Sequence, residues 1–155
     1  MWDATLVDSA AVTATHLSAQ RFASALAARL DAHVPPPVRV FTGRSVPPLA
    51  EDDVTVRVVN GTEPWDALVV SEFQLEATDN ESSLDVAADL AVTVLGFVQD
   101  RVVRVFREPW PRLSTGEIAL PAARADDQRI HLWFGPSESR SAMTLPPIEL
   151  AELTA

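Results

Sequence analysis

The chain has 155 residues, of which 47% are hydrophobic, and it carries a formal net charge of −10 at pH 7. This length and composition predict one folded domain, spanning residues 1–155, with a substantial core. The absence of cysteine excludes disulfides, thiol nucleophiles and zinc–thiolate sites. The acidic balance argues against nucleic-acid binding, which calls for a basic surface.

The first predicted element is a helix over residues 15–33, where Ala and Leu dominate. Its apolar residues recur at helical spacing and predict one buried face, formed by Ala19, Phe22, Ala23, Leu26 and Leu30. The three prolines at 35–37 end this helix, because residues before proline are driven out of the helical region.

Three strands are predicted next, over residues 38–42, 53–59 and 67–75, of which the second alternates and is rich in Val. The dipeptide Asn60-Gly61 is a turn signal between the second and third strands. The short connection predicts that these two strands are antiparallel neighbours.

The segment 84–107 is the main predicted helix, with Ser82 or Ser83 as its N-cap. Its polar and small residues follow at steps of three or four and draw one narrow stripe, composed of Asp85, Asp89, Thr93, Gly96, Asp100, Arg104 and Arg107. Every other residue between 84 and 98 is apolar. Such a helix is buried on most sides, so it either lies across a sheet beneath other elements or uses its exposed flank as a dimer surface.

Weaker strand patterns follow at 117–122, 129–134 and 141–148, and a short helical tail ends the chain. Strands that come in blocks, rather than alternating with helices, predict an α+β fold. We expect two layers, with an antiparallel sheet of about five strands and two main helices in the order α-β-β-β-α-β-β.

No catalytic, cofactor-binding or metal-binding signature is present. The histidines His16, His33 and His131 have no metal-ligand spacing, and the glycines and serines form no dinucleotide loop, P-loop or nucleophile elbow. The acids Glu76, Asp79 and Glu81 resemble part of a calcium loop but lack its central glycine. We therefore expect a protein that is not an enzyme and holds no cofactor or metal.

The stretch RVVRVFREPWPR, residues 101–112, is the exception to the acidic charge, because it holds four arginines. One interpretation is structural: arginines complement the negative end of a helix, Asp100 pairs with Arg104, Pro109 ends the helix, and Trp110 covers its apolar end. The other is a rim that binds a protein partner, since Arg and Trp are enriched at interface hot spots. The candidate protein-binding residues are Arg101, Arg104, Trp110 and Arg112.

Four motifs in the second half of the chain, VQDRV, EPWP, HLWFGP and LPPIEL, resemble a group of small uncharacterised actinobacterial proteins. The resemblance covers roughly residues 97–150 and implies a bacterial origin, while it assigns no site residues. The expected element order is also similar to that of small acidic secretion chaperones of bacteria, which are dimeric.

These observations together favour a small acidic protein-binding domain, an adaptor, chaperone or immunity-type protein, that forms a homodimer through the 84–107 helix or a sheet. One alternative is an enzyme or small-ligand binder whose site is assembled from scattered residues, which a deep pocket around His131 or the arginines would favour. Another is an acidic mimic of nucleic acid that uses the twelve Asp and Glu residues between positions 51 and 100. The chain has no secretory signal in its first residues and no uninterrupted run of roughly 18 apolar residues, so we expect a cytoplasmic protein that does not bind membranes.

Overall fold

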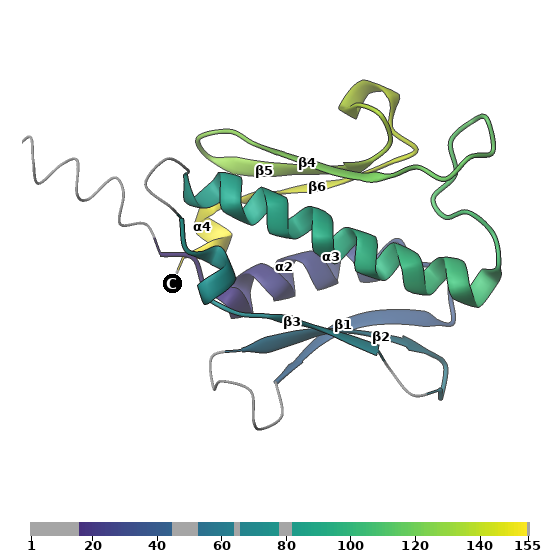
Figure 1. The fold of residues 1–155 in the computed structure, drawn as a ribbon, viewed down its shortest axis with the longest axis horizontal. Coiled ribbons are helices and arrows are strands. Elements are labelled where there is room, and N and C mark those ends of the chain that lie inside the picture. The colour runs from purple at the N-terminus through teal and green to yellow at the C-terminus, as the bar shows by residue number, and fades with distance from the viewer. Residues whose placement is uncertain (1–15, 45–52, 64–65, 78–81, 155) are drawn as a thin grey trace, which may run out of the picture.

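Two long helices lie between two small antiparallel sheets (Figure 1). The computed structural model describes residues 16–44, 53–63, 66–77 and 82–154. In chain order, the elements are α2 (Ala19–Asp31), β1 (Val38–Arg44), β2 (Val54–Asn60), β3 (Asp66–Val70), the 3-10 turn η1 (Phe73–Leu75), α3 (Ser83–Phe106), β4 (Pro121–Ala125), β5 (Arg129–Phe134), the 3-10 turn η2 (Glu138–Arg140), β6 (Met143–Glu149) and α4 (Leu150–Leu153).

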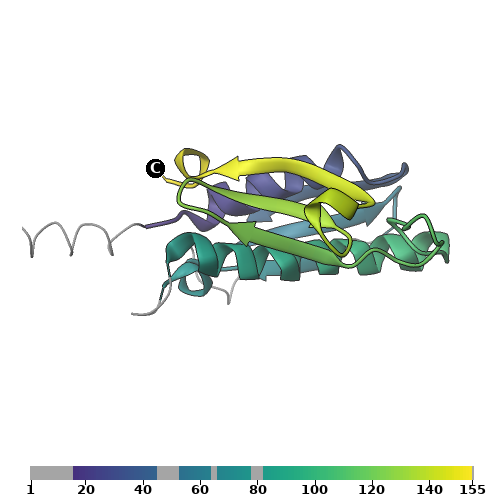
Figure 2. The same ribbon diagram turned by 90° about the horizontal axis from the view of Figure 1, so that it is seen from above.

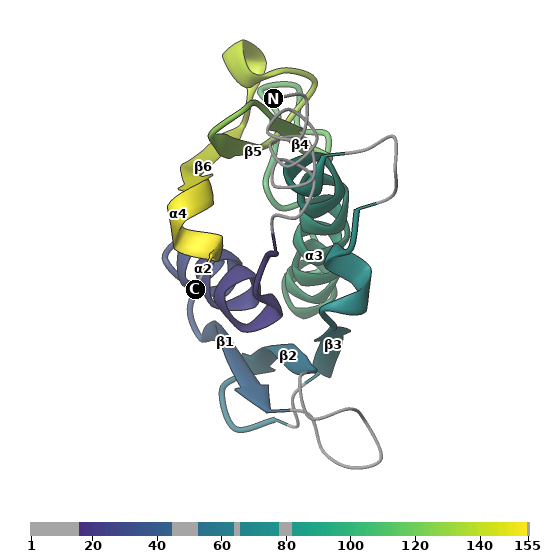
Figure 3. The ribbon, with the colours of Figure 1, turned by 90° about the vertical axis from the view of Figure 1, so that its left-hand side faces the viewer.

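The sheets have the strand orders β1-β2-β3 and β4-β5-β6, and all neighbouring strands are antiparallel. Viewed end-on, the molecule has three layers, with one sheet below the helices and the other above them (Figure 3). Viewed from above, α3 runs along the β4 side of the upper sheet and α2 along the β6 side (Figure 2). The α+β class is confirmed, whereas the predictions of two layers and of a single five-stranded sheet are wrong. The predicted order α-β-β-β-α-β-β is also wrong, because a third strand, β6, and the short helix α4 follow β5.

The composition of α3 explains the third layer. A single sheet covers only one face of a helix, but α3 packs against β4 and β5 on one side, β2 on another and α2 on a third. The predicted polar stripe is the face that remains, since Asp85, Asp89, Thr93, Asp100 and Arg104 are all exposed. Gly96 is half-buried, facing Pro121 of β4.

The helix boundaries follow the capping residues. Ser18 caps α2 by accepting a hydrogen bond from the Arg21 N–H at 3.2 Å, and Ser82 caps α3 in the same way from Asp85 at 3.1 Å. The five residues expected on the buried face of the first helix are all fully buried. Arg107 ends α3 with a left-handed φ of 60°, two residues before Pro109.

Two strand predictions needed correction, and local hydrogen bonds explain both. The predicted strand 67–75 stops at Val70, because Ser71 and Gln74 bond to each other and draw the chain into η1. The predicted strand 117–122 becomes β4 at Pro121–Ala125. Residues just before it are already engaged in a loop, in which Ala119 N–H donates to the Pro111 carbonyl at 2.9 Å.

Two polar side chains, one buried and one half-buried, tie the layers together. Gln99 of α3, 5% exposed, donates to the carbonyl of fully buried Ala119 at 2.7 Å. Arg29 of α2 donates to the carbonyls of Pro146 and Pro147 in β6 and pairs with Glu152 of α4 at 3.0 Å. The described residues include no helix that is long and apolar enough to cross a membrane.

Candidate functional site

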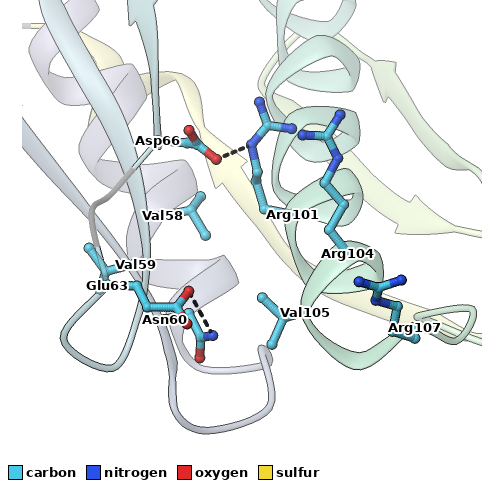
Figure 4. Close-up of a pocket in the computed structure, with 9 residues that line it drawn as sticks. All are labelled: Val58, Val59, Asn60, Glu63, Asp66, Arg101, Arg104, Val105 and Arg107. Atoms are coloured by element: carbon cyan, nitrogen blue, oxygen red, sulfur yellow. Dashed lines mark hydrogen bonds and ion pairs between the residues drawn. The ribbon is translucent and has the colours of Figure 1, made fainter.

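A groove of about 330 Å³ opens between the last turns of α3 and the turn that joins β2 to β3 (Figure 4). We call it the arginine groove. The helix contributes three arginines and a valine, and the hairpin contributes polar and apolar side chains; the lining residues are Val58, Val59, Asn60, Glu63, Asp66, Arg101, Arg104, Val105 and Arg107.

The elements bring these residues together for local reasons. Arg101 and Arg104 are three residues apart on α3, which places them on neighbouring parts of its surface, and Arg107 is the residue that ends the helix. On the hairpin side, Gly61 takes a left-handed φ of 62° that suits a tight turn. Asn60 then donates to Glu63 at 3.3 Å, which stabilises the turn that faces the helix.

Arg101 forms a fixed wall of the groove. Its Nε lies 2.7 Å from Oδ2 of Asp66, and its guanidinium sits 4.7 Å from the centre of the Phe97 ring. The Arg101 Nε–H does not point at any described acceptor with hydrogen-bond geometry. Its contact with Asp66 is therefore an ion pair without a hydrogen bond. With its side chain only 22% exposed, Arg101 joins α3 to β3.

Arg104 and Arg107 differ from Arg101, because their charges are not neutralised. Both are exposed, and neither side chain makes an ion pair or hydrogen bond with another described residue. The predicted pair between Asp100 and Arg104 does not form, whereas Arg101 pairs across to β3 instead. Two free guanidinium groups therefore line one wall of the groove.

Trp110 and Arg112, the other two predicted site residues, do not line the groove. Trp110 is half-buried against the core, with its ring centre 5.8 Å from that of fully buried Phe134 in β5. Arg112 pairs with Glu108 at 3.0 Å on the exposed loop after α3. The stretch 101–112 therefore divides into a groove-lining part and a part that packs or pairs locally.

Seven of the nine groove residues were outside the predicted site, which included only Arg101 and Arg104 of this set. Arg107 was recognised as part of the helix stripe, and the Asn60-Gly61 turn was recognised as a hairpin signal. Nothing in the order of the residues indicates that Asn60, Glu63 and Asp66 face the end of a helix some forty positions later. That placement depends on the packing of β2 against α3.

His131 lies outside the groove, on the outer face of β5 between buried Ile130 and Leu132. Its Nε2 is 2.9 Å from Oδ2 of Asp126, and its Nδ1 is 3.9 Å from Oε2 of Glu138. A hydrogen bond from the Gln128 N–H, followed by the contacts with His131 and the Arg129 N–H, lowers the pKa of Asp126 to about 2. The hydrogen bond from Arg124 likewise lowers the pKa of Glu138.

These contacts organise the β4–β5 turn and attach η2 to β4. They form no metal site, since no group of three His, Asp or Glu residues within the described ranges is placed to hold an ion. Of the calcium-loop fragment, Glu76 is exposed, while Asp79 and Glu81 lie outside those ranges.

Comparison with family models, with curated proteins and with solved structures finds no match to this chain.

Proposed function

We propose that this chain is a non-enzymatic protein-binding domain that acts in the cytoplasm, and that the arginine groove receives an acidic segment of its partner. The observation that carries the proposal is that Arg104 and Arg107 have no acidic partner among the described residues, in a chain whose net charge is −10. In such a protein a local excess of positive charge attracts acidic groups that the rest of the surface repels.

The charge of the groove supports an acidic ligand. The three arginines exceed the two acids, Glu63 and Asp66, and Asp66 is already paired with Arg101. Guanidinium groups bind carboxylates through paired N–H donors, and Arg is enriched at the centre of protein interfaces. The negative end of the α3 dipole weakens this attraction by a fraction of a charge, which two free arginines outweigh.

The shape and lining of the groove favour a protein segment over a small metabolite. A volume of about 330 Å³ is at the lower limit of the roughly 300–1,000 Å³ of small-ligand pockets. Such pockets are lined mainly by apolar side chains, whereas six of the nine residues lining the arginine groove are polar or charged. The groove opens onto the exposed stripe of α3, where a longer segment has room to extend.

A titration with an acidic peptide tests the proposal. Isotope-labelled protein is titrated with a hexaglutamate peptide with blocked ends, and the amide and guanidinium resonances are followed by NMR. We expect shifts at Asn60, Asp66 and the residues of 101–107, and none with a hexaglutamine peptide of the same length. Binding should weaken as salt is added, because the Debye length falls to about 10 Å at 0.1 M.

Charge reversals supply the matched controls. We expect R104E with R107E to weaken peptide binding at least about tenfold, because each reversal turns an attraction into a repulsion. R21E makes the same change on an exposed residue of α2 and should leave binding unchanged. Equal binding by all variants, or shifts that map elsewhere, would disprove the role of the groove.

A further inference from the structure

The exposed face of α3 carries opposite charges at its two ends. Asp85 and Asp89 lie in its first half and Arg104 and Arg107 at its end, and all four are exposed. Building on the proposed function, we propose that the acidic segment is supplied by a second copy of this chain. The two copies pair through their α3 helices in antiparallel orientation.

The spacing of these charges is nearly symmetric about the point between Gly96 and Phe97. At about 1.5 Å per residue, Asp89 lies about 11 Å before this point and Arg104 about 11 Å after it. Asp85 and Arg107 lie about 17 Å and 16 Å away on the two sides. A two-fold axis through this point therefore places each acid opposite an arginine of the second copy.

The same spacing selects the orientation. In a two-fold interface, residue i contacts residue j and residue j contacts residue i, so every match is made twice. Antiparallel pairing gives four opposite-charge contacts, two between Asp89 and Arg104 and two between Asp85 and Arg107. Parallel pairing would set each charge against its own copy and would repel at every position.

The centre of the stripe suits close contact. Thr93 and Asp100 lie about 5 Å on either side of the same point, so the Thr93 hydroxyl of one copy can donate to Asp100 of the other. Gly96 faces Pro121 of β4, and half-buried Phe97 lies within one residue of the axis. Further half-buried apolar residues border the stripe, namely Val86, Leu90, Val92 and Val103.

Each sheet has one of its two edges on this flank of the molecule. β3 and β4 are edge strands that lie on the α3 side, while β1 and β6 lie on the α2 side (Figure 3). Within the described residues, no further strand pairs with the outer edge of β3 or β4. A second copy docked on α3 brings β3 beside β3 and β4 beside β4, which covers edges that otherwise attract other chains.

A charge-swap experiment tests the pairing by light scattering on the full chain. We expect the native chain at low ionic strength to have the mass of two copies. D89R and R104D should each dissociate about 100-fold more readily, because each places like charges together twice. The double variant D89R/R104D should restore the dimer, and so should an equal mixture of the two single variants, since every contact is then complementary again.

The controls separate loss of pairing from loss of fold. D127R and R140D make the same charge changes on exposed residues away from α3 and should remain dimeric. Far-UV circular dichroism should show every variant folded, since Asp89 and Arg104 are exposed and make no contact that the fold needs. A monomeric native chain, or a dimer that both single reversals leave intact, would overturn the proposal.

The peptide titration distinguishes this proposal from the function on which it rests. D89R leaves the arginine groove unchanged, so it should bind hexaglutamate as a monomer. A native monomer that binds the peptide would refute self-pairing while the groove keeps its function. If the charge reversals dissociate the dimer but the D89R variant does not bind the peptide, the groove binds only a second copy of this chain.

Discussion

Replacing Trp110 by alanine decides which of the two interpretations of residues 101–112 applies to that residue. Trp110 is half-buried, and a fully buried Trp removes about 150–250 Å² from water. About 100 Å² is then lost in the variant, which corresponds to about 2.5 kcal/mol at about 25 cal/mol/Å². The tilted contact with Phe134, at 5.8 Å and 57°, adds about 1 kcal/mol. We expect W110A to lower the free energy of unfolding by about 3 kcal/mol.

Urea unfolding followed by far-UV circular dichroism measures this loss without relying on tryptophan fluorescence. W110F keeps a ring against Phe134 and should lose only about 1 kcal/mol, because most of the apolar contact survives. Under conditions where W110A is folded, it should bind hexaglutamate as the native chain does, since Trp110 does not line the groove. If W110A is as stable as the native chain but no longer binds the peptide, then Trp110 is a binding residue and not a packing residue.

Three further predictions test other contacts. Q99M should lower the free energy of unfolding by about 1–3 kcal/mol, since it leaves the buried Ala119 carbonyl unpaired, and urea denaturation measures this with the same change at exposed Gln128, Q128M, as the control; a change below about 0.5 kcal/mol would mean that the carbonyl finds another donor. G135A should cost about 1–3 kcal/mol in the same assay, because Gly135 has a φ of 141° and an added Cβ would lie 2.8 Å from Cα of Ser141; native-like stability would show that the β5–β6 turn adjusts freely. The folded-state pKa of Asp126, about 2, is below its unfolded value of about 3.9, so its stabilisation is complete above the unfolded pKa and lost as the pH falls through the folded one. D126N should therefore be less stable than the native chain at neutral pH, and the difference should shrink from pH 4 to pH 2; a gap in urea midpoints that stays constant with pH would contradict this.

Local patterns in the sequence predicted the elements well, because neighbouring residues determine them. The spacing of Phe22, Leu26 and Leu30 identified the buried face of α2, and the polar stripe identified the exposed face of α3. Both strand errors arose where side-chain or loop hydrogen bonds compete with the ladder, as at Ser71 and Gln74. Strand propensity is an average over many proteins, so it does not predict where a single hydrogen bond ends a strand.

The number of layers and the residues that line the groove could not be predicted from the sequence. A helix that is apolar on most sides indicates that something covers it, but a second sheet and a second copy of the chain explain that equally well. In the same way, the residues three and four positions from Arg101 along the helix include no acid, so the sequence around it pointed to no partner. Only the position of β3 made Asp66 its partner, at 2.7 Å.

The apolar faces of α3 are committed to the two sheets and to α2, so its exposed stripe is the part of the helix that can vary without disturbing the core. Dipole pairing explains why arginines rather than acids end the helix. It also accounts for Asp85, which lies in the first turn of the helix. It does not explain why Asp89, which lies beyond the first turn, occupies the mirror position of Arg104. Asp89 is exposed and takes no part in capping or core packing, and it lies as far from the middle of α3 as Arg104 does. A contact with a second chain explains this placement better than a role within the fold. For this reason the D89R and R104D reversals, which leave the core untouched, test function rather than fold.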